Sequence, residues 1–95
     1  MRPIRSATFR GRRWAVQFCK PADPRYHGLC EGPGTPDKTI SLDERMVGLG
    51  LLDLAIHEAL HACVWDLDED AVTETAWDIA RFLHRLGFRR PEDDP

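Results

Sequence analysis

A His-Glu-x-x-His pattern is formed by His57, Glu58 and His61. On a helix, residues four apart lie on the same face, so the two imidazoles would converge on one point above the helix surface. Neutral imidazole is a common ligand of Zn²⁺, and the glutamate of this pattern can act as a general base. The spacing therefore predicts a zinc site with His57 and His61 as ligands and Glu58 as the catalytic base.

Two histidines do not complete a catalytic zinc site, which usually has three protein ligands. The candidates for the third are two acidic residues of the next predicted helix, Glu69 and Glu74. At about 100° per residue, Glu69 lies about 60° from the apolar stripe at Val72, whereas Glu74 lies nearly opposite that stripe. The phase favours Glu69, because the stripe must pack on the His-bearing helix. Glu74 remains the alternative, since Asp78 follows it by one turn and could orient a ligand histidine.

Two helical segments must position these residues. The first is firmly helical from Leu51 onward, after a kink, a short turn or a separate first helical piece in residues 43–50, where glycines weaken the helical pattern. The second begins at an N-cap, either Asp66 or Asp68, and ends at a C′ glycine, Gly87. Its apolar stripe comprises Val72, Ala76, Ile79, Leu83 and Leu86.

The first half of the chain predicts short strands. Residues 4–9 and 12–18 alternate in polarity and favour two strands that turn at Arg10-Gly11. Residues 20–37 are rich in proline and glycine and predict a long loop, a candidate wall of a substrate cleft. Residues 38–42 indicate one more short strand. We therefore expect an α+β fold, with a small antiparallel sheet packed on two helices, the first bearing the His-Glu-x-x-His motif.

Length and charge limit the possible partners. The 95 residues are expected to form one domain, residues 1–95, with a frayed tail at 88–95. A net charge of −3 gives no general affinity for nucleic acid or anionic lipid, so neither is an expected partner. No apolar run approaches the ~20 residues that span a bilayer, and residues 1–20 lack the apolar core of a signal peptide.

The cysteines favour neither a disulfide framework nor a Cys₄ zinc site. The three cysteines are an odd number without C-x-x-C spacing, so they are expected to be free thiols, with Cys63 in the core. Because neither a membrane span nor a signal peptide is predicted, a cytoplasmic location is expected.

His57-Glu58-Ala59-Leu60-His61, followed by a glutamate on the next helix, resembles the gluzincin branch of zinc metallopeptidases. Over residues 38–87 the pattern is similar to small phage-encoded zincin-like proteins. The resemblance implies a zinc-dependent peptidase that acts on a peptide or protein. It also implies that a strand ahead of the active-site helix, here Lys38–Leu42, binds the substrate by backbone pairing along its edge.

Such a reaction also needs a group that stabilises the oxyanion. Tyr26 and His27, in the glycine-rich segment, and His84, in the second helix, are the candidates.

Two alternatives keep the metal without catalysis. Zinc could stabilise a small domain, since small cores often need such support. The chain could also be a non-catalytic binding module on a zincin scaffold that contacts a host protein or, through Arg10, Arg12 and Arg13, a nucleic acid.

One bound zinc ion per chain is predicted, and either His57→Ala or His61→Ala should remove it. Because a metal that binds the folded state adds to its stability, chelation should lower the melting temperature. Metal analysis and thermal unfolding with and without chelator measure both effects. Full zinc retention in both variants would contradict the prediction.

Overall fold

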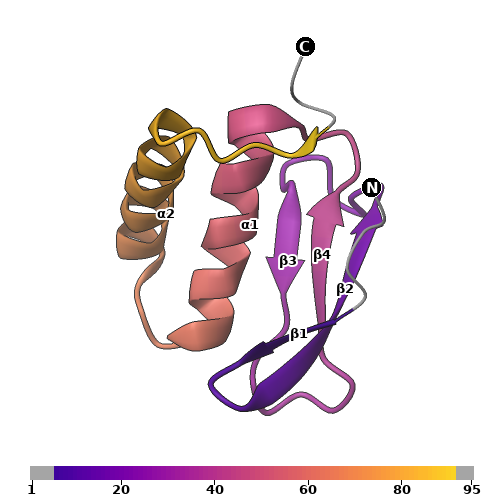
Figure 1. Ribbon diagram of the computed structural model, residues 1–95. Helices are drawn as coiled ribbons and strands as arrows, with labels where there is room; N and C mark the ends of the chain where they lie inside the picture. Colours follow the sequence, from indigo (N-terminus) through magenta and orange to yellow (C-terminus); the bar gives the residue numbers. More distant parts are fainter. Residues whose placement is uncertain (1–5, 92–95) are drawn as a thin grey trace.

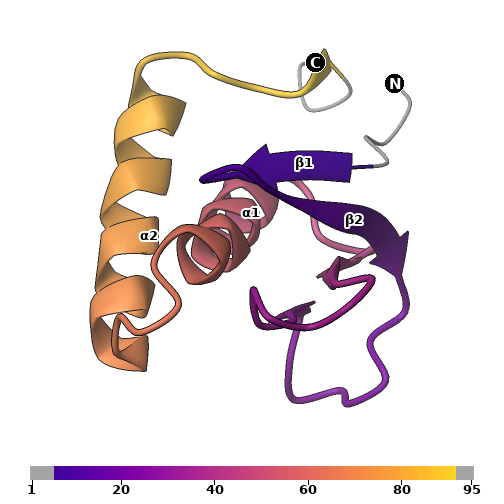
Figure 2. The same cartoon turned by 90° about the horizontal axis from the view of Figure 1, so that it is seen from below.

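The computed structural model describes residues 6–91. Within them the elements follow in the order β1 (Ser6–Phe9), β2 (Arg12–Cys19), β3 (Gly28–Cys30), β4 (Thr39–Asp43), α1 (Gly48–Cys63) and α2 (Glu69–Arg85). The strands form one sheet in the order β1-β2-β4-β3. Both helices lie on one side of this sheet, and α1 lies between the sheet and α2 (Figures 1 and 2).

The predicted α+β class, a sheet packed with two helices, is confirmed, but the sheet is mixed rather than wholly antiparallel. β1 with β2 and β3 with β4 are antiparallel pairs, whereas β2 and β4 are parallel, with Val16 beside Ile40. The reason is the connection in residues 20–38, which carries the chain back along the sheet before β4 begins. A parallel pair requires such a crossover of about a dozen residues or more.

The turn between β1 and β2 is the predicted one. Both central residues have positive φ, 51° at Arg10 and 79° at Gly11. Two such residues are typical of the type I′ turn, whose twist matches that of the flanking strands. Residues 4 and 5 of the predicted first strand lie outside the described residues.

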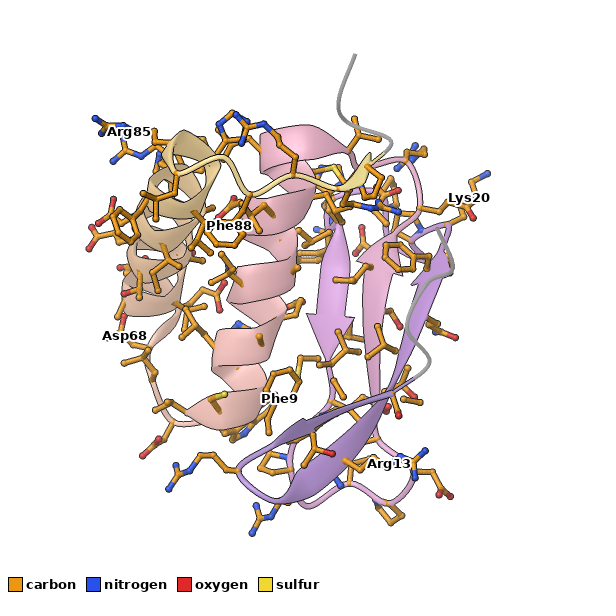
Figure 3. All side chains as sticks on the ribbon, viewed as in Figure 1. Phe9, Arg13, Lys20, Asp68, Arg85 and Phe88 are labelled. Carbon is orange, nitrogen blue, oxygen red and sulfur yellow. The ribbon has the colours of Figure 1, made fainter. Side chains whose placement is uncertain are left out.

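The core lies between the sheet and α1. Its buried side chains are Trp14, Cys30, Ile40, Leu42 and Ala62, and Phe9 packs against them (Figure 3). The fully buried Trp14 donates a hydrogen bond from Nε1 to the carbonyl oxygen of Glu31, 3.0 Å away. The buried thiol is therefore Cys30 and not Cys63, which is half-buried. Burial raises the pKa of the Cys30 thiol to about 12.

Helix α1 begins at Gly48, three residues before the predicted start. Its N-cap, Val47, makes no side-chain capping bond, so the sequence lacked the usual start signal. Gly48 has φ of +58°, a conformation that glycine adopts at little cost. In the described residues, neither α1 nor α2 combines the length and apolar character needed to cross a bilayer.

Both predicted boundaries of α2 are confirmed. Asp68 is the N-cap, and its side chain accepts a hydrogen bond from a backbone N–H of the first turn. At the other end, Gly87 has φ of +100° and donates to the carbonyl of His84, while Phe88 donates to that of Leu83. These two bonds are the Schellman motif, which satisfies carbonyls at the helix end.

The chain after α2 turns towards the sheet rather than fraying at once (Figure 1). The guanidinium of Arg90 lies over the ring of Phe18, 5.7 Å from its centre. Residues 88–91 of the predicted frayed tail are therefore placed by a contact with β2, and residues 92–95 lie outside the described residues.

Asp43, at the end of β4, joins two loops to the sheet. Its carboxylate is 1% exposed and lies 2.8 Å from His27 Nδ1. It also accepts hydrogen bonds from the backbone and the guanidinium of Arg45 at 2.9 to 3.0 Å. The Arg45 side chain and then His27 hold the pKa of Asp43 well below its ordinary range.

The lowered pKa predicts a pH dependence of stability. Because Asp43 titrates lower in the folded than in the unfolded chain, it stabilises the fold above pH about 4, and this contribution is lost as the pH falls through the folded pKa. Asp43→Asn should be less stable than wild type at pH 7, and the gap should narrow at pH 3. Urea unfolding at both pH values measures it, with the exposed Asp37→Asn as control. A gap that stays constant with pH would contradict the prediction.

Candidate metal and active site

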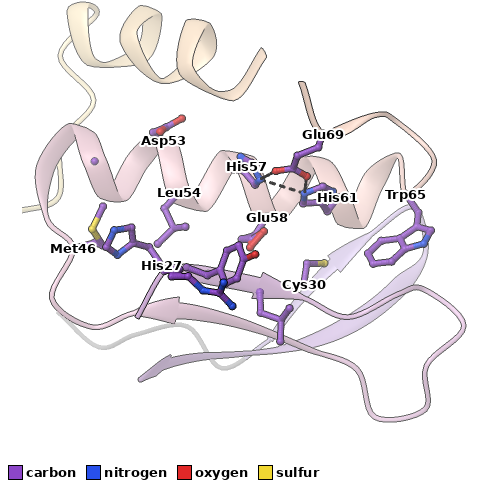
Figure 4. A pocket seen from close by; sticks show the side chains of 15 residues that line it. His27, Cys30, Met46, Asp53, Leu54, His57, Glu58, His61, Trp65 and Glu69 are labelled. Atoms are coloured by element: carbon purple, nitrogen blue, oxygen red, sulfur yellow. Dashed lines mark hydrogen bonds and ion pairs between the residues drawn. The ribbon is translucent and has the colours of Figure 1, made fainter. Parts of the chain in front are cut away.

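Three side chains converge where α1 meets the start of α2. His57 Nε2 lies 2.9 Å from Glu69 Oε1, and His61 Nε2 lies 3.0 Å from Glu69 Oε2. The two Nε2 atoms are 3.2 Å apart (Figure 4). Glu69 is the first residue of α2, and the short connection 64–68 brings it back beside the last turns of α1.

These three residues fit a zinc ion. Ligand atoms at about 2.0–2.1 Å from a tetrahedrally coordinated zinc stand about 3.3 Å from one another, and the two Nε2 atoms, 3.2 Å apart, have this separation. The carboxylate of Glu69 presents one oxygen to each imidazole, at 2.9 and 3.0 Å. Two imidazoles and one carboxylate are also the donor set of one class of catalytic zinc site. The ligand-bearing atoms of His57, His61 and Glu69 lie within 4.8 Å of one another.

The structure brings Glu69, and not Glu74, to the histidines. Glu74 is exposed and is not part of the cluster. Asp78, which the Glu74 alternative required as a partner for a histidine, pairs instead with Arg81 at 3.1 Å. The helical phase had favoured Glu69 over Glu74, and Glu69 is the residue whose carboxylate lies beside the imidazoles.

Glu58 lies on the side of α1 that faces β3, below the cluster (Figure 4). It is 4% exposed and lines a cavity of about 470 Å³ together with the three cluster residues. Burial raises the pKa of the Glu58 carboxyl to about 7, and the negative charge of Glu69 acts in the same direction. Glu58 is therefore a carboxyl group that can both take up and release a proton near neutral pH.

Because Gly28 has no side chain, the Glu58 carboxylate has room beside the backbone of β3. A Cβ atom at position 28 would lie 2.9 Å from Glu58 Oε2 and 2.7 Å from Leu54 Cδ1, closer than such atoms approach. The backbone of β3 therefore lies directly against the candidate base. No sequence pattern indicated this contact, because it depends on a strand that was predicted to be loop.

The prediction that Lys38–Leu42 offers a free sheet edge to the substrate is wrong. β4 covers most of this segment and pairs with β2 on one side and β3 on the other, so it has no free edge. The edge beside α1 is β3, a three-residue strand within the segment predicted as loop. Residues 25–30 of that segment do line the cavity, as the cleft-wall hypothesis required.

The backbone of β3 presents hydrogen-bonding groups to the open side. The carbonyl of His27 accepts from Asp43 N at 2.7 Å, and Glu31 N donates to Thr39 O at 3.1 Å, so both residues face β4. Because alternate residues of an antiparallel ladder face opposite ways, Gly28 and Cys30 direct their N–H and C=O groups away from β4.

No protein-family model, curated protein or solved structure matches the chain. The resemblance to gluzincins rests on the motif at positions 57–61 and on the glutamate of the following helix.

Two large side chains that the sequence did not single out complete the cavity. Trp65 lies at one end and Met46 at the other (Figure 4). The half-exposed Trp65 ring lies 6.1 Å from that of His61 and packs over the backbone of Gly32, where a Cβ would lie 3.3 Å from the indole. The only sequence signal for Trp65 was its position just after the motif helix.

The candidates for an oxyanion helper divide into two groups. Tyr26 and His27 line the cavity, whereas His84 is not among its lining residues. The hydrogen bond between His27 Nδ1 and Asp43 orients the imidazole ring.

The identity of the third ligand gives a matched pair of variants. Glu69→Gln should weaken zinc binding by more than about tenfold and lower the melting temperature of the zinc-loaded protein, because the carboxylate charge is lost. Glu74→Gln, the same change on the exposed side of the same helix, should leave both unchanged. Zinc titration and thermal unfolding compare them. The reverse pattern would make Glu74 the ligand.

Proposed function

We propose that this protein is a zinc-dependent peptidase that hydrolyses peptide bonds in an extended polypeptide. The observation that carries the proposal is that His57, His61 and Glu69 converge in the same cavity as the buried Glu58 and the free edge of β3. The cytoplasmic location expected from the sequence is part of this proposal.

The ligands and the base have separate roles. His57, His61 and Glu69 would hold the zinc ion. A bound zinc ion acidifies a water molecule and polarises the carbonyl of the peptide bond. Glu58 leaves α1 about 100° from His57, so its carboxylate lies to one side of the three ligands and does not join them. It accepts the proton of the attacking water and donates it to the leaving nitrogen.

The pKa and burial of Glu58 support this role. A base works best when its pKa lies near the pH at which it operates, and burial brings that of Glu58 to about 7. The carboxyl is also held in place, because Gly28 and Leu54 pack against it. Tyr26 or His27, which line the same cavity, would supply the hydrogen bond to the charge that develops on the carbonyl oxygen.

The edge of β3 would bind the substrate. An extended peptide can add to a sheet edge through main-chain hydrogen bonds, and Gly28 and Cys30 offer such groups on the open side. Because Gly28 lies directly against Glu58, a peptide paired there would run past the base. This arrangement transfers to β3 the role that the resemblance to gluzincins implied for the strand preceding α1.

The test separates the base from the ligands. Glu58→Gln keeps the shape of the side chain and removes the proton acceptor, so peptidase activity should fall by about 10²-fold or more. Zinc content should stay at the wild-type value. Cleavage of a fluorescently labelled unfolded protein and metal analysis measure the two effects, with Glu74→Gln as a control that should retain both.

Two results would reject the proposal. Activity that survives Glu58→Gln would show that the base lies elsewhere. Stoichiometric zinc without cleavage of any unfolded protein would instead support the non-catalytic, zinc-stabilised binding module.

A further inference from the structure

A second cavity, of about 500 Å³, lies on the other face of the sheet. The side chains of Ile40 and Leu42 point to the core, so the alternate residue Ser41 points to the opposite face. Leu29 is its register partner in β3 and shares that face. In the described residues no helix covers this face (Figures 1 and 2). The cavity lies between it and the segment that includes Pro21 and Ala22.

The two cavities meet at β3. The stretch Tyr26–Leu29 lines both of them, whereas none of the cluster residues lines the outer one. β3 is therefore a thin wall, a single edge strand, with the candidate active site on one side and the outer cavity on the other.

A peptide paired on this edge would reach both sides. Successive side chains of a strand point to opposite faces of its sheet. When one residue of the bound peptide points towards α1, its neighbours therefore point towards the face that carries Leu29. An edge-bound substrate therefore presents every second side chain to the outer face, where one of them can enter the cavity.

We propose that the outer cavity is a specificity subsite that binds one apolar side chain of the substrate. The inference rests on the proposed function, because it takes the substrate to be a peptide paired on β3. In the bound peptide, the residue that enters the subsite is a sequence neighbour of a residue whose side chain faces the active-site cavity. Occupancy of the subsite then fixes the position of the peptide relative to Glu58.

The lining of the cavity selects the chemistry of this side chain. Leu29 is 62% exposed although it is a large apolar residue, and Pro21, Ala22 and Cys19 add further apolar surface. Of the charged residues that line it, Asp23 is paired with Arg25 at 2.8 Å and the buried Asp43 with Arg45 at 2.9 Å, which leaves the cation Lys20. The cavity thus favours a leucine or phenylalanine side chain over a basic one, and its volume is sufficient for either.

Binding can be measured without turnover in the zinc-loaded Glu58→Gln protein. The probes are a fluorescent hexa-alanine peptide flanked by lysines and six versions of it with phenylalanine at each position in turn. In fluorescence anisotropy, the best phenylalanine peptide should bind roughly tenfold more tightly than the all-alanine peptide, as expected when one apolar side chain enters a pocket. Equal binding of all seven peptides, or no binding of any, would overturn the proposal.

Substitutions then locate the preference. Ala22→Trp should fill the cavity and abolish the advantage of phenylalanine without weakening the all-alanine peptide. Leu29→Gln, at a second exposed position, should reduce the advantage in the same way. Ala15→Trp is the matched control, since Ala15 is exposed on the same face of the sheet but does not line the cavity, and it should leave the advantage intact. An advantage that survives both Ala22→Trp and Leu29→Gln would place the phenylalanine elsewhere and overturn the proposal.

Cleavage by the protein with intact Glu58 distinguishes the two proposals. Cleavage of the same peptides at a fixed distance from phenylalanine supports both. Cleavage that ignores phenylalanine in wild type and Ala22→Trp alike would leave the peptidase standing and reject the subsite. Binding that follows the predicted pattern without any cleavage would reject catalysis and support the subsite.

Discussion

His57 and Glu58 are adjacent in the sequence, so their side chains must leave α1 about 100° apart. A helix that carries both a candidate metal ligand and a candidate base in this way has to be contacted on two sides. Here α2 supplies the first contact through Glu69, and β3 supplies the second through the backbone of Gly28. The layered order of sheet, α1 and α2 satisfies this constraint, and the cavity lies where the two contacts meet.

The features that could be predicted from the sequence are those set by short-range rules. The turn at Arg10-Gly11, the N-cap at Asp68 and the C′ glycine at position 87 each depend on neighbours within a few residues. The choice of Glu69 over Glu74 needed only the periodicity of one helix and the direction of its apolar stripe. That stripe was itself imperfect, because Ala80 is buried while Leu86 is 60% exposed.

What could not be predicted depends on pairing between distant segments. β3 has three residues within a proline- and glycine-rich stretch, too few to show an alternating pattern. Its existence follows from β4, with which it pairs, and the parallel pairing of β4 with β2 is set by the path of the long connection. The sequence therefore assigned the free edge of the sheet to the wrong strand, and it did not indicate the contact of Gly28 with Glu58.

The spacing of the three cluster residues has a consequence for the order in which the chain assembles. They fall between positions 57 and 69, on two helices joined by a short connection, whereas the sheet needs Val16 to find Ile40. Closing a short loop costs less entropy than closing a long one, and local contacts form sooner during folding. The helical hairpin with its candidate metal ligands is thus expected to form before the strand that faces Glu58 is in place. In a refolding chain the proposed metal site would therefore assemble first, and the proposed active site would be complete only when β3 closes the wall of the cavity.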